Sequence, residues 1–261
     1  MQFQEWASKN LKHRYFSLIK RLENEVDPDK CTIPFVPYRG SAYGNDNKPK
    51  ILVIGKATYG WGKREAGQGR GTLKDVLKRD DLWEYLAKLP KEFMEGQIIP
   101  FYGGERGLYH SNFWNRIFRL TGWCLYGYQV YEREQRRSEE CFRSIAWSNV
   151  FKVGALKSEG GNPNKDLISI QKDVNTLEEE IKVLRPDVAI FSTGPNYDEH
   201  IKAFLKKPMK VPKDIGPELG VKEIEGLGCL AFRTYHFQSR SNQDFKQVVN
   251  YICGRMNETV T

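Results

Sequence analysis

The sequence of 261 residues lacks an apolar run of the roughly 18 residues that a membrane-spanning helix requires. Its N-terminal stretch, MQFQEWASKNLKHRYF, contains no signal-peptide core and has the pattern of a helix. We therefore expect a cytoplasmic protein that has no membrane partner.

Cysteine and histidine are also scarce. The five cysteines contain no CxxC pair, and the four histidines show neither HxH nor HxxxH spacing. These spacings argue against an iron–sulfur cluster, a structural zinc site and a histidine-rich metal site. We expect reduced, packed thiols, no bound metal and no other cofactor.

Two common catalytic motifs are missing as well. Gly55-Lys56 follows an apolar run, but no GxxxxGK[ST] loop is present to hold a nucleotide phosphate. There is no GxSxG turn, so the alternative of a small-molecule hydrolase on an α/β scaffold lacks a recognisable nucleophile.

Positive charge and aromatic residues are plentiful. Lys and Arg number 41 against 33 Asp and Glu, for a net charge of +8, and aromatic residues make up 13%. A polyanion such as nucleic acid is the partner that this balance favours, although many basic proteins have no such partner. Basic stretches at 63–70, 133–137 and 206–213 are expected to form either a phosphate-binding groove or solvated surface.

Helical and strand patterns alternate along the chain. Helices are predicted at 3–25, 73–88 (capped by Thr72), 113–122 (ended by Gly122), 166–184, 196–206 and 243–256, with an irregular connection at 90–110. Strands are predicted at 51–54, 144–153, 187–191, 221–225 and 229–234. This order predicts a three-layer α/β/α fold with a mainly parallel sheet and a single domain over residues 1–261.

Polar and aromatic residues that could contact a ligand lie at the carboxyl ends of four of the predicted strands. The segments are GKATYGW (55–61), the turn at Asn149, STGPNYD (192–198) and YHFQSR (235–240). In parallel sheets, ligands bind at the carboxyl ends of the strands, so these loops form the candidate site. His236 is either a functional donor or a structural histidine. Asn149 is suited to reading a base edge or to a structural hydrogen bond.

In their order, these loops resemble the uracil-DNA glycosylase superfamily. The matching motifs are Gly55-Lys-Ala-Thr-Tyr59, Ile145-Ala-Trp-Ser-Asn149, Val188-Ala-Ile-Phe-Ser-Thr-Gly194 and His236-Phe-Gln-Ser239, over roughly residues 50–250. The resemblance implies four parallel strands between helices. It also implies flipping of a nucleotide out of double-stranded DNA and hydrolysis of its N-glycosidic bond, leaving an abasic site. We expect the protein to act as a monomer.

The resemblance also implies roles for individual residues. The catalytic set is His236, which stabilises the departing base, Asn149, which reads it, and Thr58, which orients water. The base pocket comprises Gly55, Lys56, Ala57, Tyr59, Trp61, Phe113 and Gly194. Contacts to DNA come from Gln238, Ser239, Arg240, Lys63, Arg64 and Arg70.

The sequence departs from the family in its first loop and its last. Lys56-Ala57-Thr58 stands where the uracil enzymes carry Asp or Asn, and Phe237 replaces a proline. Insertions near 63–110 and 124–143 are expected to widen the pocket for a modified base. Glucosylated hydroxymethylcytosine, which some bacterial relatives excise from phage DNA, is one such base.

With no Asp or Asn in the first loop, the residue that activates water must lie elsewhere in the chain. Asp46, Glu65 and Asp198 are the candidates. The alternative function is a catalytically inactive nucleic-acid-binding module on the same fold, which the missing carboxylate of the first loop supports.

Overall fold

The structure, a computed structural model, has a mixed α/β fold. It describes residues 7, 9–45, 48–57, 71–98, 112–127, 138–156, 162–237 and 241–260. The chain divides into two compact units. The first comprises Met1–Tyr38, Lys56–Lys91 and Ser148–Val183, and the second comprises Arg39–Gly55, Glu92–Trp147 and Leu184–Thr261. The single domain expected from the sequence stays a prediction.

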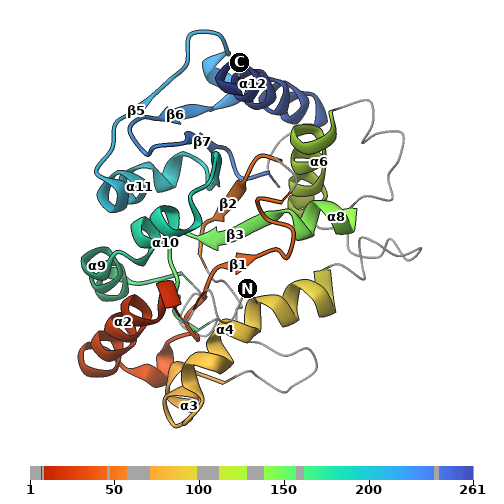
Figure 1. The fold of residues 1–261 in the computed structure, drawn as a ribbon. Helices are drawn as coiled ribbons and strands as arrows, with labels where there is room; N and C mark the ends of the chain where they lie inside the picture. The colour runs from red at the N-terminus through yellow and green to blue at the C-terminus, as the bar shows by residue number, and fades with distance from the viewer. Residues whose placement is uncertain are drawn as a thin grey trace. The chain divides into compact units, whose positions relative to one another are not determined.

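Within the described residues, seven strands form one sheet in the order β1-β3-β2-β4-β7-β6-β5 (Figure 1). The strands are β1 Tyr38–Arg39, β2 Ile51–Gly55, β3 Ile145–Asn149, β4 Val188–Ser192, β5 Met209–Lys210, β6 Lys222–Ile224 and β7 Leu230–Thr234. β4 pairs in parallel with β2 and β7, whereas β6 pairs antiparallel with β7 and β5. The α/β class is confirmed. The prediction of four strands is wrong, because three short strands flank the four longer ones.

The three strands β2, β3 and β4 are buried along their whole lengths. Their sequences, ILVIG, IAWSN and VAIFS, are close to continuous apolar runs. Such runs are typical of strands that are covered on both faces, whereas a strand with one wet face alternates apolar and polar residues.

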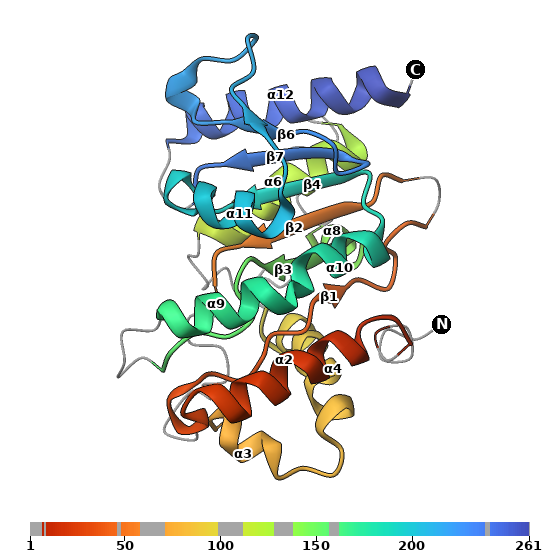
Figure 2. The same ribbon diagram turned by 90° about the vertical axis from the view of Figure 1, so that its left-hand side faces the viewer.

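In the second unit, helices cover both faces of the sheet (Figures 1 and 2). The helices on one face are α6 (Asn112–Tyr126), α8 (Ser138–Arg143) and α12 (Asn242–Val260), and the opposite face carries α11 (Asp198–Leu205). The short helices η5 (Pro195–Tyr197) and η6 (Pro217–Leu219) precede α11 and β6. On its face, α12 packs against both β7 and α6. With α11 on the other face, this unit has three layers.

The first unit is mainly helical. Its helices are α2 (Lys12–Glu25), η1 (Pro28–Lys30), α3 (Leu73–Leu77), α4 (Leu82–Phe93), α9 (Lys165–Val174) and α10 (Thr176–Leu184), and α4 runs into the π-helical turn η2 (Met94–Ile98). α2 packs against α9. The Trp83 ring lies 5.9 Å from Tyr15 and 6.3 Å from Phe16, centroid to centroid. Among the described helices, none is long and apolar enough to cross a membrane.

Two helices predicted as continuous are each divided in two. The predicted helix 73–88 becomes α3 and α4, although Thr72 caps α3 as expected, in a capping box with Asp75. The predicted helix 166–184 becomes α9 and α10, because Asn175 between them adopts a left-handed conformation with φ 49°. Asparagine tolerates the left-handed region better than most residues do. The helical spacing of apolar residues over 166–184 continues through position 175, so it did not reveal the break.

One predicted helix end is wrong, and residues 90–98 of the connection predicted to be irregular are helical. The rest of that connection, 99–110, lies outside the described residues. α6 continues through Gly122 to Tyr126 and is followed by Gly127 at φ 78°, whose amide donates to the Trp123 carbonyl. Gly127 is therefore the glycine that follows the helix end. α4 passes through Pro90, which has no amide hydrogen for the usual helical bond, and after Phe93 the chain continues as the π-helical turn η2.

The break at Asn175 generates a stability prediction. Its side-chain Oδ1 accepts from the amide of Glu178, and its Nδ2 donates to the Glu178 carboxylate at 2.8 Å. Asn175→Ala removes this cap and strains the backbone, so we expect it to lower the free energy of unfolding by about 2 kcal/mol. Asn175→Gly, the matched control, loses the cap without the strain and should cost under about 1 kcal/mol. Urea denaturation of both variants measures the difference, and equal costs would contradict the left-handed assignment.

Candidate functional site

The carboxyl ends of β4 and β7 lie side by side in the second unit. Their parallel register places Ser192 beside Thr234. Beyond β4, the Gly194 amide donates to the Thr234 carbonyl at 2.9 Å. Gly194 has φ 81°, a conformation that side-chain-bearing residues rarely adopt. The chain after β4 is thereby held against the chain leaving β7, and two of the four predicted loops meet.

The His236 imidazole is stacked on Phe113. The ring centroids lie 5.2 Å apart with 16° between the planes, so the rings are nearly parallel. Phe113 lies in the first turn of α6, and Trp114 meets its ring edge-on at 5.0 Å. Trp114 in turn meets Trp147 of β3 at 4.9 Å. This aromatic row fixes the plane of the half-buried imidazole. Gly194 also lies close to the histidine, because a Cβ atom on it would be 3.7 Å from the His236 amide nitrogen.

Both backbone groups of Phe237, the residue after His236, are held by side chains. The Phe237 amide donates to Ser192 Oγ at 3.2 Å, and Arg116 Nη1 donates to the Phe237 carbonyl. A proline here, as in the uracil enzymes, would have no amide to donate. The Phe237 ring is buried and packs edge-on against Phe245 at 5.4 Å. The loop that carries His236 is therefore anchored immediately after the histidine.

Arg116 is buried on α6, with 7% of its surface exposed. Its second guanidinium nitrogen, Nη2, donates to Asn242 Oδ1 at 3.3 Å, and its guanidinium carbon lies 5.6 Å from the Phe245 ring centroid. Burial, together with the nearby Arg119 charge, lowers the pKa of Arg116. A buried cation of this kind needs acceptors, and the Phe237 carbonyl is one of them.

Asp198, one of the candidates for activating water, is held in ion pairs. Its carboxylate lies 2.6 Å from Arg233 Nε and 2.8 Å from Lys222 Nζ. Arg233 also donates to the Gly220 carbonyl at 2.6 Å. Both oxygens of this carboxylate are engaged by cations, so neither is free to orient a water molecule. Asp198 therefore anchors α11 to β6 and β7.

Lys56, Ala57 and Asn149 belong to the first unit. The Lys56 carbonyl accepts from the Phe151 amide at 3.1 Å, so the chain after β2 is joined to the turn that follows Asn149. Asn149 is the last residue of β3 and is 4% exposed. The predicted strand 144–153 thus ends at Asn149, and the residues beyond it turn away. Gly55 is the buried last residue of β2, in the second unit.

The other predicted site residues lie outside the described residues. They are Thr58, Tyr59, Trp61, Lys63, Arg64, Arg70, Gln238, Ser239 and Arg240. The water-activation candidates Asp46 and Glu65 do so too.

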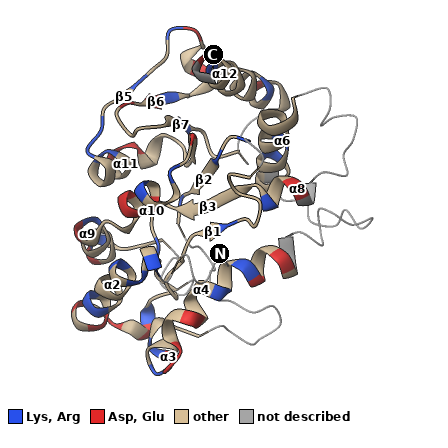
Figure 3. Ribbon diagram, viewed as in Figure 1, with Lys and Arg blue, Asp and Glu red and all other residues tan. Residues whose placement is uncertain are grey.

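One of the three basic stretches, 206–213, is described. Figure 3 shows its positive charge along the connection from α11 to β5, at the edge of the sheet. Lys210 on β5 pairs with Glu225 at 2.9 Å. Lysine on an edge strand also prevents unwanted strand pairing, so this stretch has a structural explanation that needs no DNA.

Other features of the described chain do not add to the site. No three His, Cys, Asp or Glu side chains gather there as a metal site would require, and its five cysteines are free thiols. A cavity of about 490 Å³ lies at the opposite, amino ends of β4 and β7, lined by Val188, Leu230, Met256 and neighbouring residues. Its lining is mostly apolar but includes Asp187 and Cys229, and none of the residues that the sequence assigns to the site lines it.

Two comparisons with known proteins leave the function open. No model of a known protein family matches the sequence, and a search of curated proteins also finds no match. The function therefore has to be argued from the residues themselves.

Sequence reasoning missed the two side chains that anchor the His236 loop. Arg116 shares a helix face with Phe113, Ile117 and Leu120, at the i, i+3, i+4 and i+7 spacing of a buried stripe. A charge within such a stripe was a signal that the sequence contained. The sequence contained no such signal for Ser192, because a serine at the end of a strand is equally typical of an ordinary turn.

The Ser192 contact predicts a measurable loss of stability. Ser192→Ala leaves the buried Phe237 amide without its acceptor, and we expect the free energy of unfolding to fall by about 1–3 kcal/mol. Ser17→Ala makes the same chemical change at an exposed position and should cost no more than about 0.5 kcal/mol. Urea denaturation gives both values, and hydrogen exchange at the Phe237 amide should accelerate only in Ser192→Ala. Equal stabilities of the two variants would show that the loop is not anchored there.

Proposed function

We propose that the chain is a DNA glycosylase of the uracil-DNA glycosylase type that flips out and excises a modified base. A hypermodified cytosine such as glucosylated hydroxymethylcytosine in phage DNA is the proposed substrate. The observation that carries the proposal is the meeting of the Gly194 loop with His236, whose ring lies flat on Phe113. This is the pair of loops that the sequence resemblance assigns to base recognition and cleavage.

The chemistry requires a donor at the departing base. Cleavage of an N-glycosidic bond passes through an oxocarbenium-like sugar, and the base leaves with negative charge. An imidazole N–H held in a fixed orientation stabilises that charge without reorganising during the reaction. The Phe113 stack and the anchored Phe237 backbone supply such an orientation for His236.

Base recognition falls to Asn149 in this proposal. A carboxamide has both a donor and an acceptor, which suits the Watson–Crick edge of a flipped base. Asn149 is buried at a strand end, and among the described residues only its main-chain carbonyl, not its side chain, takes part in a hydrogen bond with a side chain. Its amide therefore has hydrogen-bonding capacity left for a ligand.

The water-positioning group has fewer candidates than the sequence alone allows. Asp198 is occupied by Arg233 and Lys222, which leaves Thr58, Asp46 and Glu65. The same observation favours the second candidate function, a nucleic-acid-binding module without catalysis. Such a module needs the basic surface and the aromatic rings but no activated water.

Turnover distinguishes the two functions. We expect the wild-type protein to generate alkali-labile abasic sites in at least one DNA of a panel that contains uracil, hydroxymethylcytosine and glucosylated hydroxymethylcytosine. His236→Ala should lower the single-turnover rate by about 100-fold or more while the Kd for the DNA changes little, because the donor acts mainly on the transition state.

The matched control is His13→Ala, which removes an exposed histidine on α2. Its rate should equal that of the wild type. DNA binding without abasic sites across the whole panel would favour the binding module, and an unchanged rate in His236→Ala would reject the proposed role of the histidine.

A further inference from the structure

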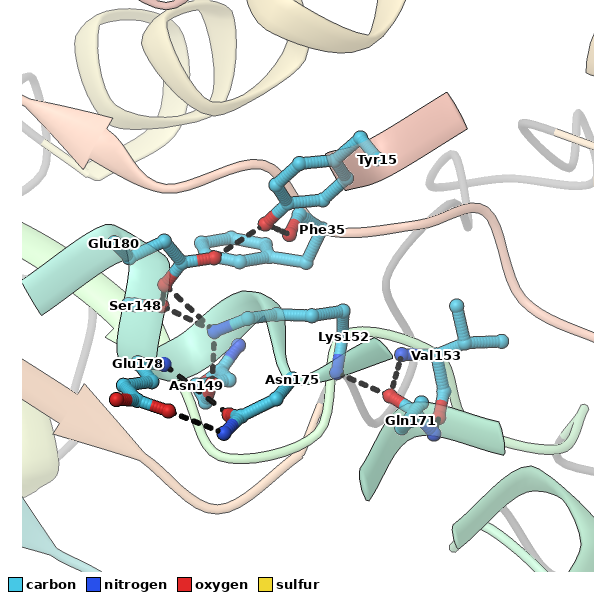
Figure 4. A network of polar contacts seen from close by, with 10 residues as sticks. All are labelled: Tyr15, Phe35, Ser148, Asn149, Lys152, Val153, Gln171, Asn175, Glu178 and Glu180. Atoms are coloured by element: carbon cyan, nitrogen blue, oxygen red, sulfur yellow. Dashed lines mark hydrogen bonds and ion pairs between the residues drawn. The ribbon is translucent and has the colours of Figure 1, made fainter. Parts of the chain in front are cut away.

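A buried lysine lies directly behind Asn149. The Lys152 side chain is 1% exposed, and its ammonium donates to Ser148 Oγ at 2.6 Å, to Glu180 Oε2 at 2.8 Å and to the main-chain carbonyl of Asn149 (Figure 4). An ammonium has three hydrogens to donate, and all three have acceptors here. One of these acceptors belongs to the backbone of the residue that the proposed function assigns to base recognition.

Glu180, the counter-ion, is fully buried on α10 and holds further groups. Its two carboxylate oxygens accept from Ser148 Oγ and from the Tyr15 hydroxyl, each at 2.5 Å. The same hydroxyl lies 2.7 Å from the Phe35 carbonyl. Burial, and then the charge of Glu180, raises the pKa of Tyr15, which keeps its hydroxyl protonated as a donor. The network therefore joins α2, the chain at Phe35, the end of β3 and α10.

The backbone after Asn149 is fixed from a second side. Gln171 Oε1 accepts from the Lys152 amide at 2.6 Å and from the Val153 amide at 2.9 Å. Gln171 Nε2 donates to the Val153 carbonyl and to the Leu167 carbonyl, both at 2.9 Å. The turn leaving β3 is thus held by a lysine head on one side and an amide on the other (Figure 4).

Stability alone does not account for an ion pair in this position. Desolvation of two charges offsets most of their attraction, and well-packed apolar residues often stabilise a fold as well or better. Burial lowers the pKa of Lys152, and Glu180 opposes that change, so the charged state depends on its partner. An apolar residue in place of Lys152 could not donate a hydrogen bond to the Asn149 carbonyl at the end of β3.

We propose that Lys152 is a positioning residue, which holds the Asn149 backbone so that its side-chain amide is presented to the flipped base in one orientation. Glu180 and Ser148 keep the ammonium in place, and Tyr15 holds Glu180. The inference rests on the proposed function, because it assumes that Asn149 reads a base.

The variants are chosen to separate the hydrogen bond from Lys152 to the Asn149 carbonyl, called the clamp below, from the ion pair between Lys152 and Glu180. Glu180→Gln, the reference, removes the counter-ion but keeps the Lys152 amine and its hydrogen bond to Asn149. Adding Lys152→Met to it removes the hydrogen bond without leaving a buried charge. Should this pair fail to fold by circular dichroism, Lys152→Gln in the same reference gives a shorter polar replacement for the identical comparison.

A double-mutant cycle with Asn149→Ala then gives the answer. Relative to Glu180→Gln, the added Lys152→Met should lower kcat by about 100-fold, because small displacements of a reacting group are costly, with KM changing much less. In the Asn149→Ala background the same addition should have almost no effect, since the group being positioned is gone. An equal loss in both backgrounds would overturn the proposal and leave Lys152 a purely structural role.

A readout without DNA separates this inference from the proposed function. The side-chain amide resonances of Asn149, assigned by their loss in Asn149→Ala, should stay sharp in Glu180→Gln and should broaden or shift once Lys152→Met is added. Unchanged resonances would overturn the clamp even if the protein excises a base. A clear change in a protein that cleaves no DNA of the panel would support the clamp and reject the glycosylase function.

Discussion

The parallel pairing of β4 with β2 on one side and β7 on the other is the constraint on which the second unit depends. Parallel strands all end at the same edge of a sheet, so the loops that follow them emerge together. The Gly194 amide joins one such loop to the Thr234 carbonyl, and Ser192 accepts from the Phe237 amide. From these contacts the half-buried His236 acquires a fixed place beside Phe113.

The two units use the same physical device next to their candidate functional residues. In the second unit the buried Arg116 donates to the carbonyl of Phe237, the residue after His236. In the first unit the buried Lys152 donates to the carbonyl of Asn149 itself. A buried cation needs hydrogen-bond acceptors, and a main-chain carbonyl at a strand end or in a loop needs a donor. In each unit one such bond satisfies both groups. Each bond holds the backbone at, or directly after, a residue to which the proposed function assigns a role.

The sequence predicted what depends on local pattern. The apolar runs predicted β2, β4 and β7, and Thr72 predicted the start of α3. The expectation that loops gather at the carboxyl ends of parallel strands placed the Gly194 and His236 loops together, whereas Phe113 was proposed only as a ring that stacks on a base. Pattern did not reveal the left-handed Asn175, which divides a helix, or the acceptors of Arg116 and Lys152, since these bonds join residues far apart in sequence. The sequence also left Asp198 among the candidates for activating water. Its ion pairs with Arg233 and Lys222 join residues that are far apart in sequence, so the sequence did not show them.

The proposed function requires the protein to break an N-glycosidic bond, and that cleavage releases the modified base from DNA. Duplex DNA carrying glucosylated hydroxymethylcytosine, incubated with the protein and filtered, is assayed for free base by mass spectrometry. We expect the filtrate to contain the intact modified base, in a molar amount equal to the abasic sites left in the DNA. Tight retention of that DNA with no free base, from it or from any other modified duplex tested, would contradict the proposed function.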